Sequence, residues 1–128
     1  MILEDFGKSF IQCIRDEVYD DFKKITEGNV KTKSLQLLLE DYEKLSQENK
    51  ILLERLVACY IDRSIFYTLR FFECEGNNKN GFHISKGKEN NIANISDGLA
   101  GEIFSEDGWI SKFSRYKEAE EIENSPFR

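Results

Sequence analysis

The chain has 128 residues, of which 40% are hydrophobic, and this suits one domain over residues 1–128 around a single core. Its net charge of −6 argues against a general nucleic-acid binder, because affinity for phosphate comes mainly from clustered Lys and Arg. No run reaches the roughly 18 apolar residues of a membrane span, and the first residues lack the pattern of a secretory signal. We therefore expect a cytoplasmic protein with no membrane or nucleic-acid partner, and a basic protein is the partner that its charge favours.

The three cysteines, Cys13, Cys59 and Cys74, are too far apart for a CxxC motif, and their odd number leaves at least one unpaired. Each falls in a predicted helix, where Cys often serves as a small buried hydrophobe. This pattern favours a reducing compartment. One His and dispersed cysteines do not supply a zinc ligand set, and no segment matches the calcium-loop template, so we predict no metal and no cofactor.

Residues 1–75 have the periodicity of helices. Apolar residues recur every three or four positions over Phe6–Ile25 with polar residues between them, and Gly28 then supplies a stop. A shorter helix is predicted over Ser34–Leu45. Ser46 separates it from a long helix over Gln47–Glu75, so that these two helices can pack as an antiparallel pair.

The predicted long helix is apolar around most of its circumference. At 100° per residue, six of its residues project to one side: Leu53, Val57, Tyr60, Ser64, Tyr67 and Phe71. A helix of this kind is normally covered on several faces, so we predict that the other elements pack around it. Arg63 and Arg70 lie within the apolar territory, where an unpaired guanidinium is costly to desolvate. We expect both to be enclosed and neutralised by carboxylates from the segment 96–110, unless they line an open groove.

Residues 76–116 differ from the helical part. The segment 76–81 has strong turn composition, and two short apolar segments follow it, one at Phe82 and Ile84 and one at Ile92 and Ile95. They predict a small β-hairpin that lies against the helices. Short helices are expected over 96–116, before a charged tail at 117–128. The predicted class is mainly α, a helical bundle around a long central helix with a small β-hairpin and short C-terminal helices.

Residues 97–110 are the densest candidate for chemistry, since they contain four carboxylates, three glycines and the only Trp. In a structural interpretation the carboxylates shape turns or pair with arginines, and the Trp covers the edge of the core. In a functional interpretation they line a cleft with the two arginines, where one carboxylate acts as an acid or base. The candidate binding residues are Arg63, Arg70, Asp97, Glu102, Asp107 and Trp109. No catalytic residue is assigned, because no nucleophile elbow or phosphate loop occurs.

Three functional hypotheses follow. In size, acidity, helical content and lack of catalytic motifs, the chain resembles small bacterial immunity-type proteins, and this resemblance implies stoichiometric binding of a protein such as a toxin. Acidic residues on the first predicted helix would steer it toward a basic partner. The alternative is a small enzyme or ligand-binding domain with an Arg/carboxylate pocket between the long helix and residues 96–110. The third is a homo-oligomer that associates through an apolar helix face.

Overall fold

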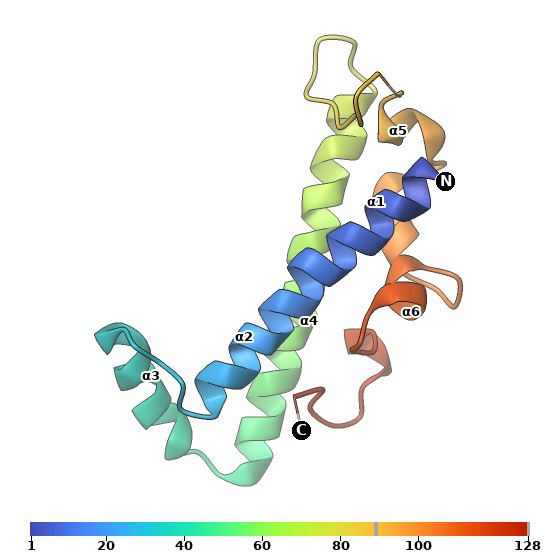
Figure 1. Ribbon diagram of the computed structural model, residues 1–128. Coiled ribbons are helices and arrows are strands. Elements are labelled where there is room, and N and C mark those ends of the chain that lie inside the picture. The colour runs from blue at the N-terminus through green and yellow to red at the C-terminus, as the bar shows by residue number, and fades with distance from the viewer. Residues whose placement is uncertain (89, 128) are drawn as a thin grey trace.

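The computed structural model describes residues 1–88 and 90–127, and the described residues form helices and loops with no β-strand. Figure 1 shows an L-shaped molecule in which two long helices cross along the long arm and the helix α3 (Lys33–Glu43) forms the short arm. Irregular segments from the last third of the chain pack along one side of the long arm. The mainly α class is therefore confirmed. After the first long helix, the elements are α3 (Lys33–Glu43), α4 (Gln47–Gly76), α5 (Ile92–Ile95), η2 (Leu99–Ile103), α6 (Trp109–Phe113) and η3 (Ala119–Glu121).

The first long helix, called here the N-terminal helix, consists of α1 (Ile2–Phe10), the π-helical turn η1 (Ile11–Arg15) and α2 (Asp16–Thr26). A π-helical turn contains one more residue than an α-helical turn, because its hydrogen bonds join residues five apart. Residues spaced by four therefore stay on one side over the whole length. Five buried residues of the helix have this spacing: Leu3, Gly7, Ile11, Arg15 and Tyr19; Asp16, next to Arg15, is also buried. The wide turn thus places a charged residue, Arg15, in line with the apolar core.

Gly7 allows the N-terminal helix to contact Trp109 closely. A Cβ atom at this position would lie 2.4 Å from the indole ring, which is too close for any side chain. The same ring lies edge-on to Phe6, with the ring centres 5.9 Å apart. Trp109 is 1% exposed and belongs to the main hydrophobic core, together with residues from α4, α5 and η2.

The predicted break at Ser46 is confirmed. Its hydroxyl accepts a hydrogen bond from the backbone N of Asn49 at 3.1 Å and so caps the first turn of α4. The expected antiparallel packing of the two flanking helices is wrong. None of the residues of α3 is buried, and the helix projects away from α4 as the short arm of the L.

The predicted β-hairpin is also wrong. Ile92–Ile95 forms the short helix α5, which begins where the Asn91 side chain accepts a hydrogen bond from the backbone N of Ala93 at 3.1 Å. Ile92 and Ala93 are both buried, whereas a strand would turn consecutive side chains to opposite faces. Between the two segments expected to pair, the described residues form one backbone hydrogen bond, from Ile92 N to Ile84 O at 2.9 Å.

Neighbouring elements cover α4 on one side only, so the prediction that it is sheathed is wrong. Its buried residues fall on one face: Glu54, Ala58, Asp62, Ile65, Leu69 and Gly76. The N-terminal helix and the C-terminal segments pack against that face. The segments after α4 form only short helices and turns, which do not extend around the far side of a helix of 30 residues. A broad apolar flank of α4 therefore remains exposed.

Candidate functional site

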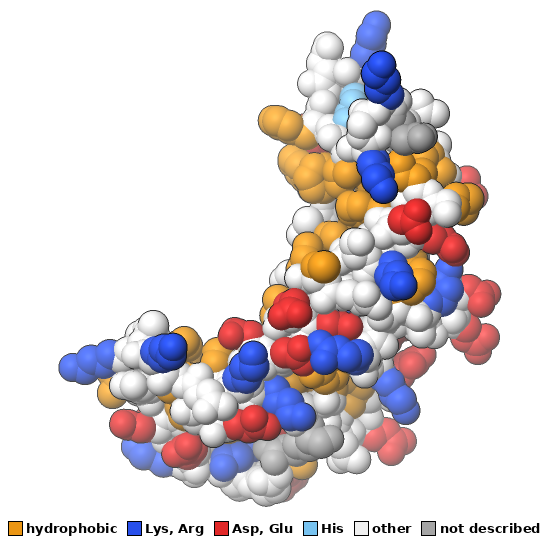
Figure 2. Space-filling model, viewed as in Figure 1, with side chains coloured by type: hydrophobic (Ala, Val, Ile, Leu, Met, Phe, Trp, Pro, Cys, Tyr) orange, Lys and Arg blue, Asp and Glu red, His pale blue; other side chains and the backbone are white. Residues whose placement is uncertain are grey.

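An apolar groove runs between the N-terminal helix and α4. It has a volume of about 470 Å³ and is lined by Phe10, Ile14, Val18, Val57, Tyr60, Ile61, Ser64, Ile65 and Thr68. Phe10, Ile14 and Val18 are spaced by four residues on the N-terminal helix, so they form one ridge along the groove. Figure 2 shows hydrophobic side chains at the surface along the concave side of the L.

The exposed flank of α4 extends this groove along the helix. Leu53, Val57, Tyr60, Ser64, Tyr67 and Phe71 are separated by alternating steps of four and three residues, which is the spacing of the a and d positions in a coiled coil. The aromatic members are strongly exposed, at 60% for Tyr60, 58% for Tyr67 and 49% for Phe71. We call these six residues the α4 stripe. A stripe with this spacing normally packs against another helix. In this structure Phe82 stacks on Phe71 at one end, with the ring centres 6.3 Å apart, and no helix of the described residues packs along the stripe.

Arg63 and Arg70 flank the α4 stripe. Each precedes a stripe residue by one position, which corresponds to the g position of a coiled coil. Arg70 Nη1 lies 3.7 Å from Glu73 Oε2 on the same helix, and the Arg70 side chain is 57% exposed. The Arg63 guanidinium lies 5.8 Å from the centre of the Tyr67 ring, and no described carboxylate lies within ion-pair distance of it. The prediction that both arginines are enclosed and paired with carboxylates of residues 96–110 is therefore wrong.

The carboxylates predicted to meet these arginines lie apart from them. Glu102 accepts a hydrogen bond from the Ser96 hydroxyl at 2.8 Å, and this hydroxyl also accepts one from the backbone N of Gly98 at 3.1 Å. Asp97 and Asp107 are exposed on turns. Leu99, Ala100 and Ile103 are buried where η2 packs on α4, so apolar side chains fill the region in which a cleft was expected.

The opposite edge of the groove is acidic. Glu17 and Asp21 follow the groove residues Ile14 and Val18 by three positions, so they are their neighbours on the N-terminal helix. Both carboxylates are exposed, and neither forms an ion pair with another described residue. The combined surface of the groove and the α4 stripe therefore has carboxylates along one edge and guanidinium groups along the other.

A buried polar cluster joins the other side of the two helices to the C-terminal segment. Arg15 is 0% exposed, and its Nε donates to Asp62 Oδ1 at 2.7 Å while its Nη2 donates to Asp62 Oδ2 at 3.0 Å. The remaining guanidinium donors bond the Ser114 hydroxyl at 2.6 Å and the carbonyl oxygens of Tyr116 and Lys117, each at 2.8 Å. Because every guanidinium nitrogen has a partner, this cluster is a structural clasp for residues 114–117.

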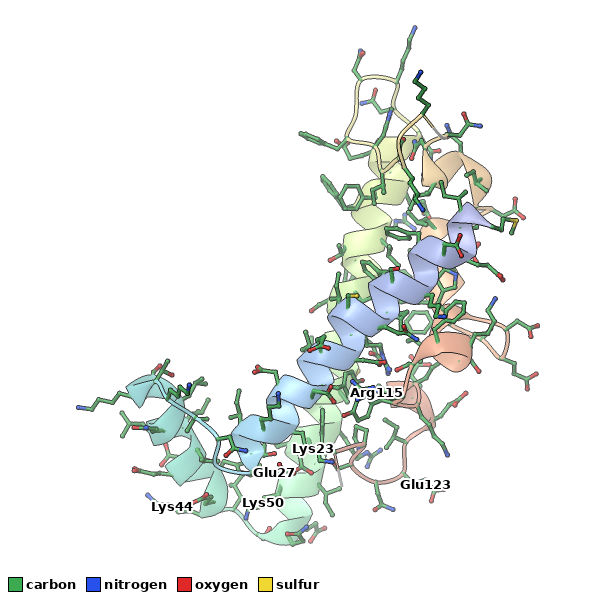
Figure 3. The ribbon with its side chains drawn as sticks, viewed as in Figure 1. Lys23, Glu27, Lys44, Lys50, Arg115 and Glu123 are labelled. Atoms are coloured by element: carbon green, nitrogen blue, oxygen red, sulfur yellow. The ribbon has the colours of Figure 1, made fainter. Side chains whose placement is uncertain are left out.

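Aromatic and acidic side chains extend the clasp. Burial raises the pKa of the Tyr19 hydroxyl, which donates to Asp62 Oδ1 at 3.1 Å. Burial also raises the pKa of Tyr116 to about 12, and its hydroxyl donates to Asp20. That hydrogen bond is the main cause of the lowered pKa of Asp20, which also receives a hydrogen bond from Arg115. Figure 3 shows Arg115 reaching from the C-terminal segment toward the N-terminal helix.

The sequence interpretation missed this cluster, since neither Arg15 nor Asp62 was among its candidate residues. A signal was present in the first helix, where Arg15 is four residues from both Ile11 and Tyr19. A regular α-helix would turn these residues gradually away from one face. The π-helical turn keeps them on one face of the helix, and no pattern in the sequence predicted that turn.

The described residues contain no group of three His, Cys, Asp or Glu side chains that could hold a metal ion. In the part of the chain that the structure describes, no helix is both long enough and apolar enough to cross a membrane. The chain matches no protein-family model, no curated protein sequence and no solved structure. The apolar groove with its charged edges is therefore the feature from which a function can be argued.

Proposed function

We propose that this protein binds another protein stoichiometrically, with the groove and the α4 stripe as its contact surface. The observation that supports this most directly is the row of exposed aromatic residues on α4, at Tyr60, Tyr67 and Phe71. Contiguous exposed apolar patches mark interaction sites, and buried aromatic side chains supply much of the binding energy at interfaces. Covering these rings with a partner would remove them from water at little cost in side-chain ordering.

The charge of the protein supports a basic partner. With a net charge of −6 and the exposed carboxylates of Glu17 and Asp21 beside the groove, long-range attraction would raise the rate of association with a basic protein. Neutralisation of a toxin is the specific activity that we propose, on the basis of the resemblance in size and acidity to immunity-type proteins. We place this activity in the cytoplasm, because Cys13 and Cys74 are exposed and unpaired, which favours a reducing compartment.

Affinity capture from the native host at low and high salt tests the proposal. Tyr60→Asp places a carboxylate in the centre of the α4 stripe and should abolish capture of the specific partner without unfolding the protein. Arg55→Asp is the matched control, because it places the same carboxylate on another exposed face of α4. The captured protein would then be purified and should form a 1:1 complex by native mass spectrometry. Capture of no partner at either salt, or equal capture by Tyr60→Asp and wild type, would contradict the proposal.

A further inference from the structure

We infer that the partner presents an amphipathic α-helix, which lies along the α4 stripe in the groove. This inference rests on the proposed function and specifies the chemistry of its partner. The alternation of four-residue and three-residue steps from Leu53 to Phe71 is the pattern that accepts side chains of a second helix between its own. At a rise of 1.5 Å per residue, the stripe is about 27 Å long, which fits a helix of about 20 residues.

The N-terminal helix makes the site a groove instead of a single helix face. Phe10, Ile14 and Val18 form the second wall, while Ile61 and Ile65 of α4 lie between this wall and the stripe. A helix placed there contacts two helices at once, as in a helical bundle. A groove with two apolar walls fits an α-helix with a broad apolar face better than an extended strand, because the thinner strand would leave part of both walls exposed to water.

The two edges of the groove specify the charges of the partner helix. Arg63 and Arg70 line one edge, and side chains at such flanking positions pair with opposite charges on the facing helix. Glu17 and Asp21 line the other edge. The matching helix therefore carries Asp or Glu on one side of its apolar face and Lys or Arg on the other side.

This pattern disfavours a second copy of the chain as the occupant. Antiparallel pairing of two α4 helices sets g positions against g positions, so the arginines of one copy would face those of the other. Parallel pairing sets Arg63 against Thr68, which has no charge, so only Arg70 would face a carboxylate, at Glu75. The net charge of −6 on each copy adds further repulsion. A different protein is therefore the occupant that the charges favour.

Three designed helical peptides of about 21 residues, with identical apolar a and d positions, test the inference. One carries Glu on one edge and Lys on the other, the second carries Lys on both edges, and the third carries Glu on both edges. Reversing a helix in the groove exchanges its edges, so the mixed peptide fits in one of its two directions. Measured by chemical-shift titration up to millimolar peptide, wild type should bind the mixed peptide roughly tenfold more tightly than either of the others, since two edge pairs change from attraction to repulsion.

The variant Arg63→Glu/Arg70→Glu makes both edges acidic and should reverse this order, so that the peptide with Lys on both edges binds best. Arg55→Glu changes the same charge on another face of α4 and should leave the order unchanged. The inference is overturned if no peptide shifts the resonances of groove residues, if the double variant keeps the wild-type order, or if wild type forms a dimer that Tyr60→Asp dissociates. Loss of the inference leaves the proposed function standing as long as a native partner is still captured through Tyr60.

Discussion

Replacing Arg15 with Met tests whether the buried clasp holds the fold together. Met is similar in length and uncharged, so it keeps much of the packing. It leaves Asp62, at 3% exposure, with hydrogen bonds only from the Tyr19 hydroxyl and from the backbone N of Ala119 at 3.2 Å. It also removes the donors for Ser114 and for two carbonyl oxygens of the C-terminal segment. The main cost is a carboxylate that stays buried after its countercharge has gone.

Removing one partner of a buried ion pair costs about 3–5 kcal/mol, which is a large part of the roughly 5–15 kcal/mol that stabilises a typical domain. Urea denaturation followed by circular dichroism would measure this loss. With an m-value of about 2 kcal/mol per M, a loss of about 4 kcal/mol lowers the midpoint by about 2 M. We expect Arg15→Met to be folded in buffer and to unfold at much lower urea concentration.

Two further variants make this measurement decisive. Arg63→Met removes the same side chain from an exposed site on α4 and should change the free energy of unfolding by less than about 0.5 kcal/mol. Adding Asp62→Leu to Arg15→Met removes the stranded carboxylate and should restore much of the lost stability, as replacement of whole buried ion pairs often does. If Arg15→Met costs less than about 1 kcal/mol, or no more than Arg63→Met, the assignment of the clasp as structural is refuted.

Three other substitutions have defined expectations. Gly7→Ala should cost about 1–3 kcal/mol in urea denaturation, because its Cβ would lie 2.4 Å from the Trp109 ring; an unchanged midpoint would mean that this contact is loose. Ser46→Ala removes the hydrogen bond to Asn49 N and should cost about 1 kcal/mol by the same assay. Burial raises the pKa of Glu118 above its ordinary value of 4.5, so its ionisation opposes folding, and stability falls as the pH rises from 4.5 through the raised pKa. Glu118→Gln should therefore be more stable than wild type at pH 7 and show no such advantage at pH 4 in thermal unfolding; equal gains at both pH values would count against burial as the cause.

Hydrophobic periodicity was sufficient to predict the long helical elements. The break at Ser46 was also predictable, since a hydroxyl residue followed by a helical pattern is a local capping signal. These features depend on residues close together in the sequence. The irregular C-terminal part was harder, because Asn occurs both in turns between strands and at helix N-caps, and here the Asn91 side chain caps α5.

The partners of the arginines could not be predicted from the sequence. An apolar helix surface has the same residue pattern whether its own chain or another protein covers it, so the α4 stripe was expected to be buried. For the same reason, the sequence pattern indicated the wrong arginines as the buried ones. Arg63 and Arg70, within apolar territory, were expected to be enclosed, whereas Arg15 is the arginine that the structure buries with a carboxylate. Which arginine is buried depends on tertiary contacts between residues far apart in the sequence.

The separation of the clasp residues along the chain has a consequence for biosynthesis. Ser114 and Lys117 follow Arg15 by 99 and 102 positions, so a ribosome that has just synthesised both long helices has not yet made the groups that complete the hydrogen bonds of the guanidinium. During that interval Arg15 can pair with Asp62 and with water, but not with the groups of residues 114–117. The nascent chain therefore closes this face only after residues 114–117 have been made, and a product that stops before Ser114 would leave Arg15 and Asp62 open to water and the two helices less firmly joined.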